Sequence, residues 1–197
     1  MAETDLPPDS PELNALFDQA IKGASGKTSS MQKLGYGSVY FLAKMDIDAD
    51  GSPRAKEIDP KDGSVNTSLR FPDGSSVNAE TMPYIVLPGG KYQGFHIALG
   101  DLAAIRYKGK VAFAVFADVG PPKKIGEGSM ELASELDIPN SPTHGGVQTP
   151  DIQYIVFPGS GDRTPGTKDG NADKALGDLR QVAEKLQKKA RNVSFGR

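Results

Sequence analysis

The run Val111–Ala117 constrains the fold most strongly, because its seven consecutive residues are all apolar. A strand with one solvent-facing side alternates apolar and polar residues, so an unbroken run predicts a strand buried on both faces. The run stops abruptly at Asp118, which we therefore expect at the rim of the core. The Gly-Pro-Pro segment 120–122 then predicts a turn that brings the chain back to Glu127.

Asp118 and Glu127 form a candidate pair of catalytic carboxyl groups. Glycoside hydrolysis needs one carboxyl group that donates a proton to the leaving oxygen and another that stays ionised to activate water or attack carbon. A rim position allows burial to raise one pKa while the wetter partner stays ionised. Gly126 and Gly128 flank Glu127 and are too small to shield it from a ligand. Two acids around a turn are also common as solvated charges, so the spacing alone leaves both interpretations open.

Three blocks of sequence carry a family resemblance. They are KMDIDADG from Lys44, MPYIVLPGG from Met82 and FADVGPPKKIGEGSMELA from Phe116. In this order they resemble the family 75 glycoside hydrolases, the fungal-type chitosanases, over about residues 44–138. The resemblance implies inverting hydrolysis of the β-1,4 links of chitosan, with Asp118 and Glu127 as the catalytic residues. This chain differs from many fungal members in having Ala49 in place of a Cys, and in a shorter loop between the two acids.

From this resemblance we expect an endo-acting hydrolase with Glu127 as general acid and Asp118 as general base. Asp46 and Asp48 are predicted to bind substrate, because an acidic cleft attracts the ammonium groups of a cationic polymer. Either of them is also an alternative general base.

Aromatic side chains are the usual surfaces for sugar rings, and the chain has no Trp. Tyr84 and Tyr92 are the predicted substitutes. Tyr84 lies in an apolar run, which also fits a core residue with its hydroxyl at the rim, and Tyr92 lies between glycines and is expected to be exposed. His96 lies inside an apolar run, so we expect a structural histidine there.

The segment from Asp46 carries the complete spacing of a calcium-binding loop. Asp46, Asp48, Asp50, Gly51 and Glu57 match the pattern D-x-D-x-D-G-x5-E. An EF-hand needs a helix on each side, whereas the residues before Asp46 have the pattern of a strand, and Asp50-Gly51 is also a hairpin signal. We therefore expect a β-hairpin with an acidic inner face, and no cofactor, with calcium as the less favoured alternative.

The composition predicts a mainly β fold. The 197 residues suffice for one core, and 23 Gly and 15 Pro favour short strands and tight turns over a helical bundle. We expect an N-terminal extension with a short helix over residues 1–33 and a single catalytic β-barrel domain over 34–197, α+β overall. Segments 83–90 (PYIVLPGG) and 153–160 (QYIVFPGS) echo each other, which favours a six-stranded double-psi barrel.

The predicted elements are short. Strands are expected where apolar runs are bounded by Gly, Pro or Asp: Val39–Met45, Arg54–Ile58, Tyr84–Leu87, Phe95–Leu99, Ile105–Tyr107, Val111–Ala117 and Ile152–Phe157. Helices are expected over Ser10–Lys22, Ser129–Glu135 and Ala172–Arg191. In the first helix Ser10 is the predicted cap, and Leu13, Leu16, Phe17 and Ile21 form the predicted apolar stripe.

Several classes of function are disfavoured. A net charge of −2 and a pI near 5.7 argue against a nucleic-acid partner. The absence of Cys excludes thiolate chemistry, and two His are too few for a three-histidine zinc site. No segment is long and apolar enough for a membrane span, so no membrane partner is expected. Phosphate-binding and serine-hydrolase motifs are also absent.

Compartment and exact substrate stay open at this level. Residues Met1–Gln19 have neither the basic nor the apolar region of a signal peptide, whereas the family resemblance implies secretion. Two alternatives to a chitosanase remain: a hydrolase of another amino-sugar polymer such as peptidoglycan, and a non-catalytic, calcium-dependent glycan-binding module.

Overall fold

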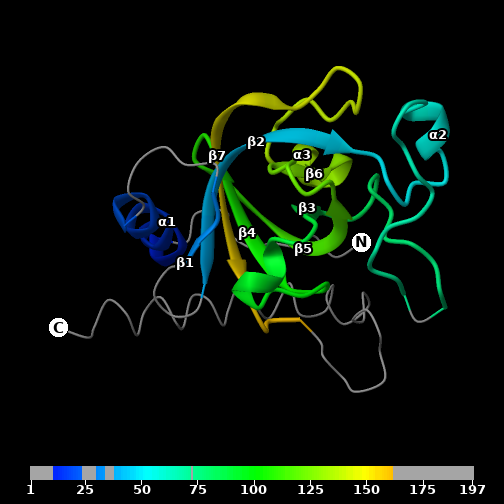
Figure 1. Cartoon of the computed structure of the whole chain (residues 1–197). Helices are drawn as coiled ribbons and strands as arrows, with labels where there is room; N and C mark the ends of the chain where they lie inside the picture. Colours follow the sequence, from blue (N-terminus) through cyan, green and yellow to red (C-terminus); the bar gives the residue numbers. More distant parts are fainter. Residues whose placement is uncertain (1–10, 24–29, 34–37, 72, 162–197) are drawn as a thin grey trace, which may run out of the picture.

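The computed structural model is mainly β (Figure 1), and it describes residues 11–23, 30–33, 38–71 and 73–161. In chain order its elements are α1 (Pro11–Gly23), β1 (Gln32–Lys33), β2 (Val39–Asp48), α2 (Ala55–Ile58), β3 (Tyr84–Pro88), the 3-10 helix η2 (Tyr92–Phe95), β4 (Leu102–Tyr107), β5 (Lys110–Gly120), β6 (Glu127–Ser129), α3 (Met130–Glu135) and β7 (Val147–Phe157). The predicted fold class is confirmed.

Six of the strands close into a barrel of mixed direction. Their order around the barrel is β2-β6-β3-β5-β4-β7, and β7 pairs back with β2. The pairs β2–β6 and β3–β5 are parallel, and the other four pairs are antiparallel. The extra strand β1 pairs with β2 on the outside of this ring. The six-stranded barrel is thus confirmed, and its double-psi character and the domain boundary at residue 34 stay predictions.

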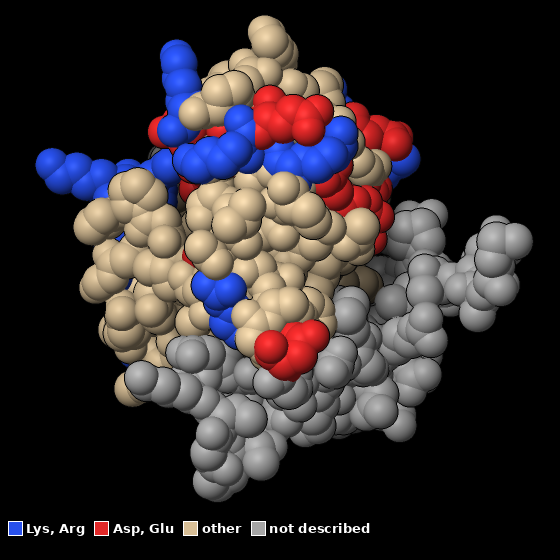
Figure 2. Space-filling view, turned by 90° about the vertical axis from the view of Figure 1, so that its right-hand side faces the viewer, with Lys and Arg blue, Asp and Glu red and all other residues tan. Residues whose placement is uncertain are grey.

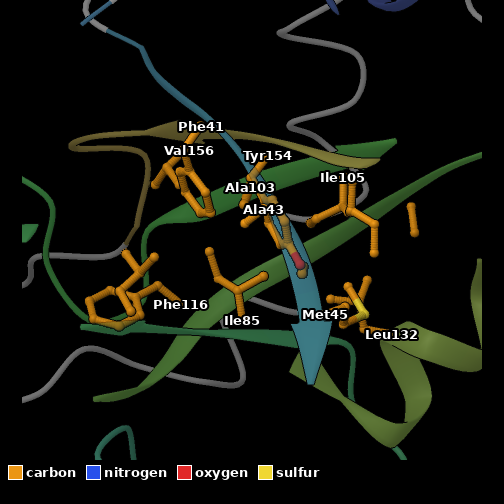
Figure 3. Packing of buried hydrophobic residues seen from close by; sticks show 14 of the residues in the cluster. Phe41, Ala43, Met45, Ile85, Ala103, Ile105, Phe116, Leu132, Tyr154 and Val156 are labelled. Carbon is orange, nitrogen blue, oxygen red and sulfur yellow. The ribbon is translucent and has the colours of Figure 1, made fainter. Parts of the chain in front are cut away.

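Alternate residues of the strands fill the barrel interior (Figure 3). Met45 of β2, Ile85 of β3 and Phe116 of β5 belong to one buried cluster. Phe41 and Tyr154 stack in the same cluster with their ring centroids 4.5 Å apart. Because side chains alternate along a strand, the residues between these face outward. The outer face therefore has to be covered by other segments or exposed to solvent.

Two segments cover parts of the outer face. Phe17 and Ala20 of α1 pack against Tyr40 of β2 and Ile155 of β7. Leu69, Val77, Ala79 and Met82 form a second cluster with outward-facing residues of β3, β4 and β5. Figure 1 shows α1 and α2 on opposite sides of the barrel. Between the covered areas, the outer face of β2 carries charged residues.

The sequence echo between residues 83–90 and 153–160 does not correspond to equivalent positions. Tyr84 packs in the cluster outside the barrel, whereas Tyr154 packs inside it. Their neighbours Ile85 and Ile155 show the reverse arrangement. The two segments share β-forming residues but present opposite faces to the core.

Two predicted strands are wrong. The residues Ala55–Ile58 form the helix α2, since Ala, Lys and Glu are good helix formers, and the chain after β2 turns at Gly51 (φ 76°) rather than entering a hairpin. In place of the predicted strand Phe95–Leu99, the chain forms η2, and His96 has a left-handed backbone (φ 59°) with an exposed side chain. A strand cannot continue through a left-handed residue.

The predicted helices have mixed outcomes. The N-terminal one is confirmed as α1 and the short one as α3, with Ser129 as its N-cap. Ile21, predicted in the apolar stripe of α1, is 48 % exposed. The Ser10 cap and the C-terminal helix Ala172–Arg191 lie outside the described residues.

Candidate active site

A row of side chains crosses four adjacent strands of the barrel. Val86 of β3 pairs with Asp118 of β5 on one side and with Glu127 of β6 on the other. Glu127 in turn pairs with Asp46 of β2. Paired residues of neighbouring strands point to the same side of the sheet, so all four point outward from the barrel. We call Asp46, Glu127 and Asp118 the carboxylate row.

A β-bulge places Asp118 in this row. Ile85 pairs with Phe116, but Val86 pairs with Asp118, so Ala117 is the extra residue of β5. Phe116 points into the barrel, and strict alternation would point Asp118 inward as well. The extra residue turns the carboxyl group to the outside, in keeping with the frequent use of bulges to aim active-site side chains.

The row forms part of a pocket of about 660 Å³. This volume lies within the usual range of ligand sites. The carboxyl groups in its lining are Asp46, Asp48, Asp50, Asp59, Asp62, Asp118 and Glu127. Lys124 also lines it, and residues 142–148 contribute further to the wall. The pocket is therefore strongly acidic.

Asp118 is held in place by three hydrogen bonds to one oxygen. Its Oδ1 accepts from the backbone N–H of Ser68 (2.9 Å), the Ser68 hydroxyl (2.5 Å) and the backbone N–H of Val119 (2.8 Å). The side chain is 8 % exposed. Such a set of donors fixes the orientation of a carboxylate at the pocket surface.

Glu127 is also buried but has a different environment. Burial raises the pKa of Glu127, and the charges of Asp46 and Asp118 add to this shift. The Lys124 ammonium donates to Glu127 Oε1 at 2.5 Å and opposes it. A Cβ built on Gly120 would lie 3.3 Å from Glu127 Oε2, so the glycine leaves room for this carboxyl group.

Neighbouring lysines balance the negative charge of Asp46. Its Oδ2 accepts from Lys44 (2.7 Å) and its Oδ1 from the Gln148 side chain (3.2 Å). Burial alone would raise the pKa of Asp46, but these two hydrogen bonds and the charges of Lys44 and Lys124 outweigh it, and the pKa is lowered. Asp46 is thus an ionised, paired carboxylate.

Asp48 lies deeper, on the same face of β2. Tyr84 donates its hydroxyl proton toward Asp48 Oδ2 (3.0 Å), and the backbone N–H of Asp50 donates to Oδ1 (2.9 Å). Burial raises the pKa of Asp48 to about 8, with Asp50 and Glu127 as the next causes. Burial also raises the pKa of Asp50 to about 6, against the hydrogen bond from Ser64. Asp48 is therefore protonated at neutral pH.

The less favoured alternative, a calcium loop of Asp46, Asp48, Asp50 and Glu57, is not assembled among the described residues. Among the described residues, Asp48, Asp50 and Asp118 are the acids whose oxygens lie within 4.8 Å of one another. Asp46 pairs with Lys44, and the side chain of Glu57 is 72 % exposed on α2, where it faces Arg54. Acidic clusters of this kind occur without a cation, so we assign no metal to the three aspartates.

Comparison with protein families places this geometry in a known context. Residues 45–193 match the model of the fungal chitosanase of glycosyl hydrolase group 75. The chain belongs to this family. It is therefore an enzyme, a chitosanase-type glycoside hydrolase whose substrate is a polysaccharide. The matched range contains the whole carboxylate row.

The comparison with individual proteins and the observations on cellular location add little to the family match. No curated protein matches the chain. Enzymes of the fungal chitosanase family are typically extracellular. In the part of the chain that the structure describes, no helix is both long and apolar enough to span a membrane.

Neither predicted tyrosine lines the pocket of this chitosanase-family enzyme. Tyr84 is fully buried, and in place of the predicted contact with sugar its hydroxyl group bonds Asp48 and the carbonyl of Asp50. Tyr92 is half-buried and packs edge-on against Phe116, with ring centroids 4.8 Å apart. Tyr84 thus acts beneath the site rather than at its surface.

The two glycines beside Glu127 are needed for packing rather than for ligand access. Gly126 has φ 85°, and a Cβ there would lie 2.2 Å from the carbonyl oxygen of Lys44. A Cβ on Gly128 would lie 2.9 Å from Leu132 inside the barrel. Both glycines let the short strand β6 lie close to its neighbours.

Sequence reasoning missed two residues of the site, Ser68 and Lys124. Ser68 lies in an irregular segment fifty residues before Asp118, with no motif that points to it. Lys124 is one of two adjacent lysines in the loop after β5, and the pair gives no sign of which one turns inward. Figure 2 shows Lys and Arg side chains beside Asp and Glu on one face of the molecule, so charges of both signs lie close together there.

Proposed function

We propose that this enzyme is an endo-acting, inverting chitosanase, with Glu127 as general acid and Asp118 as general base. The observation that carries the proposal is the single strand between the two residues. Two strand spacings separate their backbones by about 9 to 10 Å. Inverting glycosidases hold their carboxyl groups about 6.5–9.5 Å apart, which leaves room for the attacking water, and retaining enzymes about 5–5.5 Å. These ranges refer to the carboxyl groups themselves, and the strand between the two backbones supports the wider arrangement.

The environment of Glu127 supports its role as the acid. A general acid has to carry its proton at the working pH, and burial raises the pKa of Glu127 in that direction. The proton then passes to the glycosidic oxygen as the bond to the anomeric carbon breaks. Gly120 has no side chain to crowd Oε2 of Glu127.

The contacts of Asp118 support its role as the base. The three hydrogen bonds from Ser68 and Val119 converge on Oδ1, and they hold the carboxylate at the pocket surface beside the side chain of Asp50. In the proposed reaction Asp118 removes a proton from a water molecule that attacks the anomeric carbon from the side opposite the leaving group.

Asp48 and Asp46 are less suited to act as the base. Asp48 has a pKa of about 8 and stays protonated where a chitosan chain is charged. Asp46 is ionised, but Lys44 and Gln148 occupy its two oxygens. In our proposal the ionised Asp46 contributes negative charge to the pocket, Asp48 lines it in its neutral form, and Asp118 removes the proton.

Chitosan is the proposed substrate because its glucosamine units carry ammonium groups. Seven carboxyl groups line the pocket, and those that are ionised, which excludes Asp48 and the protonated form of Glu127, attract a cationic chain. Peptidoglycan and chitin carry neutral N-acetyl groups and gain less from it. A calcium-dependent glycan-binding module without catalysis is not favoured, since the family consists of hydrolases. We propose that the enzyme is secreted, because enzymes of this family are typically extracellular.

Activity assays on chitosan oligomers test the proposal. Glu127→Gln and Asp118→Asn are each expected to lower kcat by about a thousandfold or more, because each removes a proton-transfer group. Glu57→Gln, on the exposed surface of α2, is the matched control and should keep wild-type rates. Proton NMR of the first products should show inverted anomers. Wild-type rates in both active-site variants, or products of retained configuration, would contradict the proposal.

A further inference from the structure

Lys124 reaches from the loop between β5 and β6 into the carboxylate row. Its Nζ lies 2.5 Å from Glu127 Oε1 and 3.7 Å from Asp46 Oδ2. The side chain is 36 % exposed and lines the pocket, whereas that of the neighbouring Lys123 is exposed and outside it. The local chain therefore directs one lysine inward and the other outward.

The other charged groups that act on Glu127 are mostly acidic. Asp46 and Asp48 face it from β2, Asp50 from the turn after β2, and Asp118 from β5. The charge of Asp46 is offset by Lys44, which donates to it at 2.7 Å. Lys124 is thus the cation in direct hydrogen-bond contact with the carboxyl group of Glu127.

The contact with Lys124 and burial shift the pKa of Glu127 in opposite directions. Burial and the nearby acids raise the pKa of Glu127, and the ammonium of Lys124 lowers it. Burial lowers the pKa of Lys124, but the hydrogen bond to Glu127 and the charge of Glu127 outweigh this effect, so the pKa of Lys124 is raised. Lys124 therefore stays charged over the whole range in which Glu127 titrates.

A general acid works only while it holds its proton, so activity falls as the pH rises through its pKa. An opposite charge within about 4–6 Å of a carboxyl group lowers that pKa by about 1–3 units. The ion pair with Lys124 therefore limits how high the pKa of Glu127 rises, and with it the highest pH at which the enzyme is active.

We propose that Lys124 is a positioning residue that fixes the side chain of Glu127 and sets the upper pH limit of activity. This inference rests on the proposed role of Glu127 as the general acid. The segment Lys124–Gly126 before Glu127 then has a role in catalysis in addition to forming the turn.

The pH dependence of kcat/KM on chitosan oligomers tests the inference in Lys124→Met, which keeps the aliphatic stem and removes the charge. The alkaline limb of the kcat/KM profile is expected to move up by about one pH unit or more, because Glu127 of the free enzyme then keeps its proton to higher pH. Lys123→Met is the matched control and should follow the wild-type profile. Lys124→Arg should restore most of the wild-type limb. The substrate titrates identically in all four assays, so its own ionisation cancels in the comparison.

A measurement without substrate keeps the test independent of activity. In a carbon-13 NMR titration, the carboxyl resonance of Glu127, assigned with Glu127→Gln, should reach its midpoint at higher pH in Lys124→Met than in the wild type. Coinciding midpoints and coinciding alkaline limbs would overturn the inference. If Glu127→Gln is inactive and the limbs coincide, only the inference about Lys124 fails. If Glu127→Gln is active, the proposed function itself fails.

Discussion

Asp118 and Glu127 pair with the same residue, Val86, from opposite sides of β3. Their separation is thus fixed by the backbone hydrogen bonds of three adjacent strands, and sites built on such elements hold their geometry better than sites on loops. The loops decide a different property, the orientation of each carboxyl group. Ser68 holds Asp118, and Lys124 holds Glu127.

Ser68→Ala is expected to lower kcat by about tenfold while KM changes little. The substitution removes the hydroxyl donor to Asp118 Oδ1 but keeps the backbone donor of residue 68, so the carboxylate is held less firmly. Steady-state kinetics on chitosan oligomers measure the effect. Ser64→Ala, in the same irregular segment but with its hydroxyl group bonded to Asn66, is the control. Equal kcat values for Ser68→Ala and wild type would show that the hydroxyl group does not orient the base.

Asp48→Asn is expected to stabilise the fold at high pH and to keep most of the activity. The folded-state pKa of Asp48, about 8, lies above its ordinary value of 3.8. The stabilisation by its neutral form is therefore complete below pH 3.8 and is lost as the pH rises toward 8. An amide keeps the neutral form at every pH, so the variant should gain at least about 1 kcal/mol at pH 8 and nothing near pH 4.

Urea unfolding at a series of pH values measures this difference. Asp73→Asn is the control with the opposite sign, because hydrogen bonds from Ser75 lower the pKa of Asp73. A stability difference between Asp48→Asn and wild type that is constant with pH would contradict the protonated state of Asp48. Loss of activity in Asp48→Asn would favour Asp48 as the general base.

Gly126→Ala is expected to destabilise the protein by clearly more than Gly109→Ala. Both glycines have a left-handed backbone, φ 85° and 84°, in which a Cβ costs about 1–2 kcal/mol. At Gly109 nothing lies within 4 Å of the added Cβ, whereas at Gly126 the carbonyl oxygen of Lys44 lies at 2.2 Å. The melting temperatures of the two variants measure the difference. Equal losses would mean that β2 and β6 move apart without cost.

The KM for chitosan oligomers is expected to rise with ionic strength. The ionised carboxyl groups in the pocket lining attract ammonium groups, and salt screens this attraction, because the Debye length falls from about 30 Å at 0.01 M to about 10 Å at 0.1 M and lower still above that. Raising the salt from 0.01 M to 0.5 M should increase KM several-fold and leave kcat nearly constant. N-acetylated oligomers, assayed as competitive inhibitors, provide the neutral control. An unchanged KM for the cationic substrate would contradict attraction by the acidic pocket.

Much of the site was accessible from sequence because its acids stand beside strong local signals. The apolar run Val111–Ala117 predicts the buried strand β5, and Asp118 directly follows that run, although the strand continues to Gly120. The family blocks pointed to Asp118 and Glu127 together, and the structure places the two in one row. The strand β6 was not predicted, since its three residues, Glu-Gly-Ser, have no β-forming tendency.

The sequence by itself determined the mainly β character, the buried strand, the turn after it and the acids that flank that turn, since these depend on residues close together in the chain. Only the tertiary structure decided that Ala117 forms a bulge, that Tyr84 and Tyr154 face opposite sides of the barrel wall, and that Ser68 and Lys124 hold the two carboxyl groups. Each of these depends on register. A shift of one residue between strands reverses the side to which every side chain points, and that register is set by pairing between strands far apart in sequence.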